Sequence, residues 1–303
     1  MKRILITDGM EKDAVENLRS AGFELVEQYY EVEELKEQIK NFDVAVVRSA
    51  TKIRQSIIDA AMETGRLKLI IRGGVGIDNI DYEYAETKGI TVMNTPNASS
   101  ASVAELAIGH LFSLARYMYI ANHTMRCGKW NMKNYQGIEL TGKTLGLIGF
   151  GRIAKETAKR AAALGMKVLY TKKSCPEKGF DDYEYVTFDE LLAESDFISL
   201  HMPCLKDKSP IIGKEQIAKM KDGVYIVNTA RGDLINEDEL LDALDSGKVA
   251  AAALDVFAEE PTKNQRLYTH DKVSITPHIG ASTIEAQKRV GDEVVQIILK
   301  YFE

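Results

Sequence analysis

The sequence is poor in cysteine and proline and contains no long apolar segment, and each shortage excludes a class of protein. Its three cysteines, Cys127, Cys175 and Cys204, form no Cys-x-x-Cys pair, which argues against a disulfide framework and against a zinc site. Only six residues are proline and no low-complexity tract occurs, so we do not expect extended disorder. No apolar run approaches the roughly 20 residues that a membrane-spanning helix needs.

The chain also lacks an excess of basic charge. Its 39 lysines and arginines are outnumbered by 45 acidic residues, and a net charge of −6 is atypical of proteins that coat nucleic acids. Residues 1–8 become polar too quickly for a signal peptide. We therefore expect a cytoplasmic protein with no metal site, no nucleic-acid partner and no membrane contact.

Short β-branched segments alternate with longer segments of helical periodicity along the chain. The expected strands are residues 3–7, 44–48, 67–71, 90–93, 144–148, 168–170, 197–200, 224–227 and 273–276. The expected helices include residues 13–21, 33–41, 153–164 and 237–246. This alternation is typical of βαβ units, and 303 residues are enough for two domains. We therefore expect an α/β protein whose parallel sheets carry helices on both faces.

Two further helices are predicted from Ser-x-x-Glu patterns, in which the serine caps the helix. In the first, Ser102 is expected at or just inside the start of the helix, which is apolar nearly all round and continues to about Ile120. The second follows Ser282 and carries an apolar stripe that includes Val290 and Val294. The natural domain boundary lies near residues 94–100, just before the first of these helices.

A glycine motif follows the strand expected at residues 144–148. It reads Gly149-Phe150-Gly151-Arg152-Ile153-Ala154, which is the G-x-G-x-x-A pattern of dinucleotide-binding domains. Gly149 permits a tight turn, Gly151 lets the backbone approach a pyrophosphate, and Ala154 lets the helix pack closely on the sheet. The start of that helix would offer N–H groups to the phosphates. The alternative is a glycine-rich turn in another kind of α/β protein.

The end of the next strand bears on the choice of dinucleotide. An acidic residue about 20 positions past the glycines normally accepts the ribose hydroxyls of NAD, and this chain has Lys172 and Lys173 there. The nearest acids, Glu177 and Asp181, are expected too far along the chain to lie at the strand end. Two lysines would attract a 2′-phosphate, which slightly favours NADP(H) over NAD(H). The alternative is that both are ordinary surface lysines.

Two side chains with catalytic chemistry, Arg231 and His278, follow expected strands, and a third, Glu260, lies between them in the sequence. Among five histidines, His278 alone lies in a glycine-containing loop between a strand and a helix, where ligands of open α/β sheets bind. His110 is expected on a helix face, His123 and His270 at the surface, and His201 in a structural role. Arg231 can hold a planar carboxylate through two hydrogen bonds, and Glu260 is the candidate partner of His278. The three suit proton and hydride transfer at a carbinol.

These residues closely resemble those of the D-isomer-specific 2-hydroxyacid dehydrogenases, and the resemblance covers essentially the whole chain. The shared motifs are residues 72–79, 92–97, 128–130, 149–154, 228–232, 253–261 and 276–283. Residues 48–52, 130–142 and 280–287 are most similar to the D-3-phosphoglycerate dehydrogenases, in the short form without a C-terminal regulatory domain. Family members usually carry aspartate where this chain has Lys172.

The resemblance implies roles for particular residues. Arg231 would bind the substrate carboxylate and carbonyl, and His278, paired with Glu260, would be the acid/base catalyst. The substrate set further includes Arg48, Lys52, Gly74, Val75 and Gly76, with Arg48 and either Lys52 or Arg54 at the 3-phosphate. The implied cofactor set is Val75, Gly149, Gly151, Arg152, Ile153, Lys172, Pro203, Thr229, Ala230, Asp255 and Gly280. Asp255 would face the nicotinamide carboxamide.

The resemblance also implies the layout. A flavodoxin-like substrate domain is built from residues 1–95 and 282–303, and a Rossmann cofactor domain of residues 96–281 is inserted into it. Both domains are doubly wound parallel sheets. The long helix after Pro96 commonly supports a homodimer. The length fits the catalytic core, with no residues left over for a regulatory domain.

The expected reaction is oxidation of 3-phospho-D-glycerate to 3-phosphohydroxypyruvate by NAD(P), in L-serine biosynthesis. One alternative is a glyoxylate or hydroxypyruvate reductase, or another D-2-hydroxyacid dehydrogenase; Lys172 favours an NADPH-dependent reductase, and residues 48–52 favour a phosphorylated substrate. The second alternative is a dinucleotide-sensing protein that resembles the transcriptional corepressors with this fold. The absence of a disordered tail argues against that second alternative.

Overall fold

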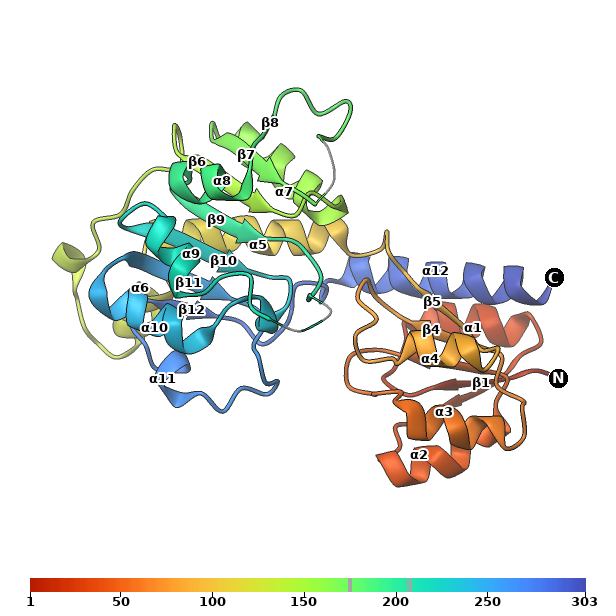
Figure 1. Cartoon of the computed structure of the whole chain (residues 1–303). Helices are drawn as coiled ribbons and strands as arrows, with labels where there is room; N and C mark the ends of the chain where they lie inside the picture. Colours follow the sequence, from red (N-terminus) through yellow and green to blue (C-terminus); the bar gives the residue numbers. More distant parts are fainter. Residues whose placement is uncertain (174–175, 206, 208) are drawn as a thin grey trace. The chain divides into compact units, whose positions relative to one another are not determined.

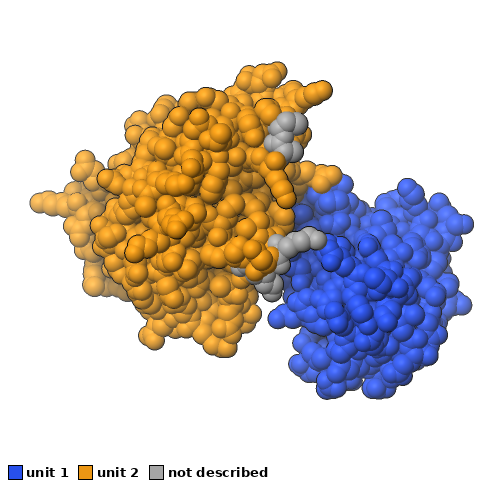
Figure 2. Space-filling view, viewed as in Figure 1, with its two compact units in different colours: residues 1–99, 281–303 blue, residues 100–280 orange. Residues whose placement is uncertain are grey.

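The computed structural model describes residues 1–173, 176–205, 207 and 209–303, which form two compact units. Unit 1 contains Met1–Ser99 and Ala281–Glu303, and unit 2 contains Ser100–Gly280 (Figure 2). The chain thus leaves unit 1 once and returns to it for the last helix. Of the three cysteines, Cys175 lies outside the described residues.

Unit 1 is a five-stranded parallel sheet in the order β2-β1-β3-β4-β5. This is the doubly wound order of flavodoxin-like folds. The strands are β1 (Arg3–Ile6), β2 (Glu24–Glu27), β3 (Val44–Val47), β4 (Leu69–Arg72) and β5 (Thr91–Asn94). The helices are α1 (Lys12–Ser20), α2 (Val32–Gln38), η1 (Ile39–Asn41), α3 (Gln55–Met62), α4 (Tyr82–Thr87) and α12 (Ile284–Phe302) (Figure 1).

Both faces of this sheet are covered, because successive side chains of each strand point to opposite faces. Ile4 and Ile6 of β1 pack with α1 and α12, whereas Leu5 packs on the other face with α2 and α3. Helix α12 approaches α1 so closely that a Cβ on Gly291 would lie 2.7 Å from the Cβ of Ala14. The cap of α12 is Thr283, whose Oγ1 accepts the Ala286 N–H, so the predicted cap at Ser282 is wrong by one residue.

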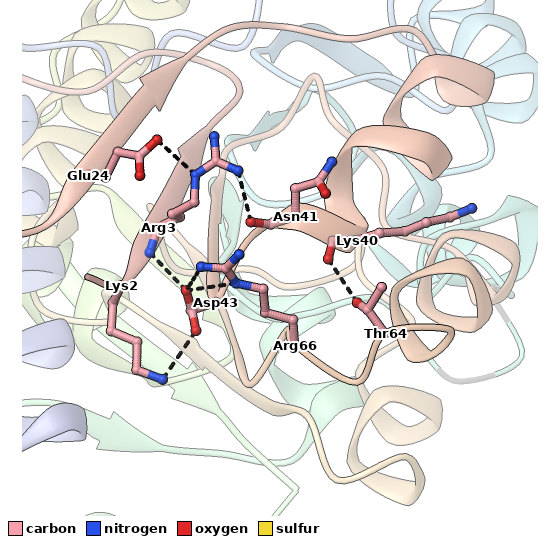
Figure 3. A network of polar contacts seen from close by, with 8 residues as sticks. All are labelled: Lys2, Arg3, Glu24, Lys40, Asn41, Asp43, Thr64 and Arg66. Atoms are coloured by element: carbon pink, nitrogen blue, oxygen red, sulfur yellow. Dashed lines mark hydrogen bonds and ion pairs between the residues drawn. The ribbon is translucent and has the colours of Figure 1, made fainter.

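An acidic residue ties the amino ends of the unit 1 strands together. The carboxylate of Asp43 accepts hydrogen bonds from the Arg3 N–H at 2.8 Å, from Lys2 Nζ at 3.1 Å and from Arg66 Nη2 at 3.0 Å (Figure 3). Burial opposes its ionisation, but the Arg3 N–H, Arg66 and Lys2 outweigh burial and hold the pKa of Asp43 below its usual value. This network lies at the end of the sheet opposite to the strand ends where ligands of such folds bind.

Unit 2 is a seven-stranded parallel sheet in the order β12-β11-β10-β9-β6-β7-β8. Its strands are β6 (Thr144–Ile148), β7 (Lys167–Thr171), β8 (Glu184–Tyr185), β9 (Phe197–Leu200), β10 (Val224–Asn228), β11 (Val249–Leu254) and β12 (Val273–Ile275). When β6 is counted as the first strand and the sheet is read from β8 toward β12, the first six strands have the order 3-2-1-4-5-6, which is the Rossmann arrangement. The predicted fold class, two doubly wound parallel sheets, is confirmed.

Helices cover both faces of the second sheet. Its helices are α5 (Ser100–Ala115), α6 (Met118–Arg126), η2 (Met132–Asn134), α7 (Arg152–Ala163), α8 (Phe188–Glu194), α9 (Lys214–Lys219), η3 (Gly232–Leu234), α10 (Glu237–Ser246) and α11 (Gln265–Tyr268). Helices α5 and α7 pack on one face, and α8, α9, α10 and α11 pack on the other. Within the described residues, every helix is too short or too polar to cross a membrane.

The predicted helix that continues to about Ile120 differs from the structure at its carboxyl end, whereas Ser102 lies just inside its start as expected. Helix α5 begins at Ser100 and ends at Ala115, and α6 follows after Tyr117, which has a left-handed backbone with φ of 56°. At the end of α5 the Ala115 carbonyl accepts a hydrogen bond from Ile138 N–H at 2.9 Å. The prediction of one continuous helix is therefore wrong.

Candidate active site

The three residues expected to be catalytic lie in the loops that follow three neighbouring strands of unit 2. Strand β11 pairs with β10 on one side and with β12 on the other, all in parallel. Arg231 follows β10, Glu260 lies in the loop after β11, and His278 follows β12. Because the carboxyl ends of parallel strands meet at one edge of a sheet, the fold places these three loops side by side.

His278 and Glu260 form a direct hydrogen bond. Nδ1 of His278 lies 2.7 Å from Oε2 of Glu260, and the other carboxylate oxygen accepts the Phe257 N–H at 3.1 Å. Partial burial opposes the charge on Glu260, but His278, the Phe257 N–H and Arg231 outweigh it, so the pKa of Glu260 lies below its usual value. A carboxylate at Nδ1 makes that nitrogen the donor and leaves Nε2 available for a substrate proton.

Arg231 is held by the residue that ends β10. Asn228 Oδ1 accepts the Ala230 N–H at 3.0 Å, and Asn228 Nδ2 donates to the Arg231 carbonyl at 2.8 Å. The next residue is glycine for a steric reason: a Cβ on Gly232 would lie 1.9 Å from the carbonyl carbon of Phe257. The Arg231 loop can therefore lie directly against the loop that carries Glu260, and Arg231 contributes to the lowered pKa of Glu260.

Asp255, directly after β11, holds the His278 loop through hydrogen bonds. Its buried carboxylate accepts hydrogen bonds from Thr276 Oγ1 at 2.6 Å, from Ile279 N–H at 2.8 Å and from Gly280 N–H at 2.9 Å. The Asp255 carbonyl also accepts the His278 N–H at 2.8 Å. These bonds hold His278 in a left-handed conformation with φ of 52°, which is uncommon for a residue with a side chain.

Buried His110 extends this network. Its Nε2 lies 3.2 Å from Thr276 Oγ1, and the Thr276 hydroxyl donates its own hydrogen to Asp255. His110 Nε2 is therefore the donor in this pair. Burial lowers the pKa of His110, and Asp255 offsets this only in part, so the ring is neutral at pH 7. The predicted position of His110 on a helix face is correct, but sequence reasoning missed its link to the catalytic loop.

The glycine turn fits a dinucleotide pyrophosphate. Gly149 has φ of 92°, and a Cβ there would lie 2.6 Å from the carbonyl oxygen of His201, so a larger residue does not fit. Gly151 caps α7 without a side-chain hydrogen bond, and a Cβ on it would point into open space. Arg152 and Ile153 form the first turn of α7. The turn thus leaves helix N–H groups and an open space for an anion.

Two further strand ends carry candidate cofactor residues. Thr229 follows β10, and its buried Oγ1 finds no hydrogen-bond partner among the described residues, so it is available to a bound ligand. Pro203 lies exposed after β9. His201 lies two residues before Pro203, and its Nε2 is 2.9 Å from Ser199 Oγ. Burial lowers the pKa of His201 to about 4. His201 is a neutral structural group at neutral pH.

Lys172, directly after β7, is paired with an acid. Its Nζ and Oε2 of Glu177 form an ion pair, and the other Glu177 oxygen lies 2.7 Å from Nζ of Lys155. The expectation that Glu177 lies too far along the chain to reach the strand end is wrong, because its carboxylate pairs with Lys172, directly after β7. The slight preference for NADP(H) relied on Lys172 and Lys173 attracting a 2′-phosphate, and Lys172 is already paired with Glu177.

The candidate substrate residues of unit 1 lie at the carboxyl ends of β3 and β4. Gly74, Val75 and Gly76 follow β4, and Arg48 follows β3 with its Cγ 3.6 Å from where a Cβ on Gly73 would lie. Lys52 is exposed. Arg54 is bound to Asp81 at 2.9 Å and to the Asp78 carbonyl at 3.1 Å, so it is already engaged within the protein.

Two residues that sequence reasoning missed shape the Arg48 segment. Asp8 accepts the Arg48 N–H at 2.6 Å and the Thr51 hydroxyl at 2.7 Å. Asn79 donates to the carbonyls of Arg48 and Thr51 at 2.6 and 2.7 Å. Asp8 comes just after β1, and a polar residue at a strand's carboxyl end is the signal that could have identified it.

Comparisons with known proteins agree with this geometry. The sequence model of the D-isomer specific 2-hydroxyacid dehydrogenase, NAD binding domain, matches residues 108–280. The chain is 49% identical over 302 residues to hydroxypyruvate reductase of Thermotoga maritima, which covers 98% of this chain and 97% of that protein. It is 47% identical over 303 residues to D-3-phosphoglycerate dehydrogenase of Methanocaldococcus jannaschii, which covers 99% of this chain but 57% of that protein.

A solved structure supports the same relationship. Glyoxylate reductase from Paecilomyes thermophila superposes with a TM-score of 0.92 at 34% identity, covering 100% of this chain and 95% of that one. The chain thus spans nearly the whole length of two reductases and little more than half of the phosphoglycerate dehydrogenase. The similarity therefore includes both units.

Proposed function

This chain belongs to the D-isomer specific 2-hydroxyacid dehydrogenase family and is a nicotinamide-dependent oxidoreductase of D-2-hydroxy acids, and we propose that it interconverts 3-phospho-D-glycerate and 3-phosphohydroxypyruvate. The proposal places it in L-serine biosynthesis, in the cytoplasm. The relatives named above are enzymes, which favours catalysis over dinucleotide sensing.

The proposal of a phosphorylated substrate depends on the surroundings of the Arg48 guanidinium. Its guanidinium is half-buried and forms no ion pair or hydrogen bond with any described residue, because Asp8 is occupied by the backbone of Arg48 and by Thr51. Burial lowers the pKa of Arg48, and the charge of Asp8 offsets this only in part. A half-buried guanidinium with unused donors is suited to bind a phosphate through two hydrogen bonds.

In this proposal the unit 2 residues perform the proton chemistry. His278 takes the proton of the C2 hydroxyl through Nε2, because Glu260 holds Nδ1 and stabilises the imidazolium that forms. Arg231 binds the carboxylate and stabilises negative charge on the C2 oxygen. When bound, the nicotinamide supplies the hydride acceptor for oxidation and the donor for reduction. Asp255 and Asn228 hold His278 and Arg231 in place through the hydrogen bonds described above.

A second candidate function is the reduction of hydroxypyruvate. It is favoured by the 49% identity to the Thermotoga maritima hydroxypyruvate reductase over 97% of that protein's length. Hydroxypyruvate presents the same carboxylate and carbonyl to Arg231 and His278 but has no phosphate for Arg48. Arg48 is therefore the residue that distinguishes the two candidates, because only the phosphorylated substrate requires it.

Steady-state kinetics with both oxo acids test the proposal. We expect a higher kcat/KM for 3-phosphohydroxypyruvate than for hydroxypyruvate, and Arg48→Gln should lower the former about 10–100-fold, as for a lost charge-assisted hydrogen bond. Activity with hydroxypyruvate should change little. Arg19→Gln is the matched control, because Arg19 forms ion pairs with Glu16 and Glu27 on the surface of the same unit. Equal losses on both substrates, or faster turnover of hydroxypyruvate by the wild type, would reject the phosphorylated substrate.

We also propose that the protein is a homodimer. Large apolar side chains are exposed on α6 and in the segment after it: Met118, Met125, Trp130 and Met132. A second copy would remove these side chains from water. Sedimentation of the wild type and of Met118→Asp tests this, and a wild-type monomer would contradict it.

A further inference from the structure

The end of β7 is where this chain departs from other dinucleotide-binding domains. The carbonyl of Thr171, the last residue of β7, accepts the Gly149 N–H at 3.0 Å, so this strand end lies directly beside the glycine turn. The next residue, Lys172, occupies the position at which NAD-binding domains carry an acid for the adenosine ribose. A lysine there cannot accept a hydrogen bond from a ribose hydroxyl.

A carboxylate from further along the chain contacts the lysine at this position. Glu177 forms ion pairs with Lys172 and, at 2.7 Å, with Lys155 of α7. The Glu177 N–H donates to the hydroxyl of Tyr170 at 2.9 Å, which ties its backbone to β7 as well. Glu177 is thus attached to the strand before the site and to the helix after the glycine turn.

The surrounding aromatic rings hold this arrangement against the glycine motif. Phe150, between Gly149 and Gly151, stacks on the buried ring of Tyr170 with 3.8 Å between centroids. Nζ of Lys155 lies 4.6 Å from the ring centroid of Phe180, on the far side of Glu177 in sequence. The backbone of Glu177 is therefore held by Tyr170, and Lys155 is held by Phe180, in addition to the two ion pairs of the carboxylate.

We propose that Glu177 replaces the missing strand-end acid and makes NAD the preferred dinucleotide of this enzyme. Its carboxylate engages two lysines and keeps lone pairs for the ribose hydroxyls, since a carboxylate has about four acceptor positions. A 2′-phosphate would have to approach this carboxylate, and Lys155 and Lys172 are already paired with it. This reverses the slight preference for NADP(H) that the two lysines favour from the sequence.

The charge state of Glu177 is consistent with this role. Its ion pairs with Lys155 and Lys172 lower the pKa of Glu177 to about 2, so the group is a carboxylate at every pH at which the enzyme would work. A permanently charged acceptor selects against a phosphate throughout that range. The inference concerns dinucleotide binding and holds whichever hydroxy acid is the substrate, so it can fail without affecting the proposed reaction.

The contrary arrangement uses the same side chains. Lys155 and Lys172 would bind the 2′-phosphate of NADP, and Glu177 would leave them when the nucleotide binds. The two arrangements make opposite predictions for the removal of the Glu177 charge, because only in the first does that charge repel the phosphate. Direct binding measurements on the whole chain distinguish them.

Isothermal titration with adenosine 5′-monophosphate and adenosine 2′,5′-bisphosphate isolates this end of the site, because the two probes differ only in the 2′-phosphate. NAD and NADP are titrated in parallel, and kcat/KM is measured with both. The wild type should bind the monophosphate and NAD about tenfold more tightly than their 2′-phosphorylated counterparts, as for one charge-assisted hydrogen bond. Tighter binding of the 2′-phosphorylated probes by the wild type would overturn the proposal.

Glu177→Gln should raise affinity for adenosine 2′,5′-bisphosphate and for NADP about tenfold and weaken NAD binding. Glu184→Gln is the matched control, because Glu184 pairs at 2.8 Å with Lys167 at the other end of the same strand. The double variant Glu177→Gln/Lys172→Gln should lose the gained NADP affinity. If Glu177→Gln leaves the NAD-to-NADP affinity ratio as unchanged as Glu184→Gln does, the assignment of Glu177 is wrong.

Discussion

Nδ1 of His278 lies 2.7 Å from Oε2 of Glu260, and the two residues come from the loops that follow the adjacent strands β12 and β11. The pair lies at the carboxyl edge of a parallel sheet, beside the Arg231 loop. A histidine oriented by a carboxylate in this way has one ring nitrogen assigned to the protein and one to the substrate. The following predictions test this arrangement and the contacts that maintain it.

Replacing His278 with asparagine should remove the acid/base catalyst. We expect kcat to fall about 10²–10⁴-fold, the usual contribution of general acid–base catalysis. Dinucleotide affinity should be preserved, because the glycine turn after β6 is independent of the imidazole. Stopped-flow turnover and titration calorimetry measure the two quantities. Near-normal turnover in a folded variant would show that another group transfers the proton.

Replacing Glu260 with glutamine should change the pH dependence of catalysis. The carboxylate is ionised well below neutral pH because His278, the Phe257 N–H and Arg231 lower the pKa of Glu260. Its loss removes the counter-charge of the imidazolium, so the limb of the kcat/KM profile that reports His278 should move to lower pH. Profiles of the wild type and Glu260→Gln from pH 5 to 10 measure this shift. Superimposable profiles would argue against the pairing.

Thr276 is predicted to be a positioning residue for His278. Thr276→Val removes the hydroxyl that links His110 to Asp255, and we expect kcat to fall about tenfold, an amount set by one buried hydrogen bond, with KM nearly unchanged. Thr276→Ser keeps the hydroxyl and should restore kcat. A loss of thermal stability in Thr276→Val with normal kcat would mean that the hydroxyl serves folding alone.

Asp43 is predicted to stabilise the folded chain in a pH-dependent way. Its folded pKa lies below the unfolded value of about 3.9, so its contribution is complete above that pH and is lost as the pH falls through the folded pKa. Asp43→Asn should lower the free energy of unfolding by about 1–3 kcal/mol at pH 7. Urea melts at pH 7 and at pH 3 measure the difference, which should shrink at the lower pH.

The control for Asp43 is an exposed acid of the same unit. Asp13 lies 3.7 Å from Lys288, with most of its side chain in water. Such a surface pair contributes little, so Asp13→Asn should change the free energy of unfolding by less than about 1 kcal/mol at either pH. Equal changes in the free energy of unfolding from both substitutions would mean that the buried network at Asp43 stabilises the protein no more than a surface ion pair does.

Much of the candidate site could be predicted from the sequence. Four of its residues could be located because each follows a β-branched strand: Gly149, Gly151, Arg231 and His278. The carboxyl ends of parallel strands lie at one edge of the sheet, however the helices pack on it. The same reasoning predicted the alternating strands and helices of both sheets. These inferences depend on chain-local chemistry, which is present in the sequence itself.

Other elements could not be predicted because distant residues decide them. Strand β11 (Val249–Leu254) was missed since four alanines have low strand propensity, and it forms because β10 and β12 supply its hydrogen bonds. Strand β2 was missed as well, and so was the short β8. Helix α5 ends where Ile138 binds the Ala115 carbonyl, a contact with a residue far along the chain.

The sequence by itself thus determined the fold class, the glycine turn and the strand-end positions of Arg231 and His278, because each follows from local pattern and from the geometry of parallel sheets. Only the tertiary structure decided which charges are already paired. Lys172 meets Glu177, Arg54 meets Asp81, and Arg48 keeps its guanidinium unused among the described residues. The physical reason is that a charge is neutralised by whichever group the folded backbone brings within hydrogen-bonding distance, and spacing along the chain does not reveal it.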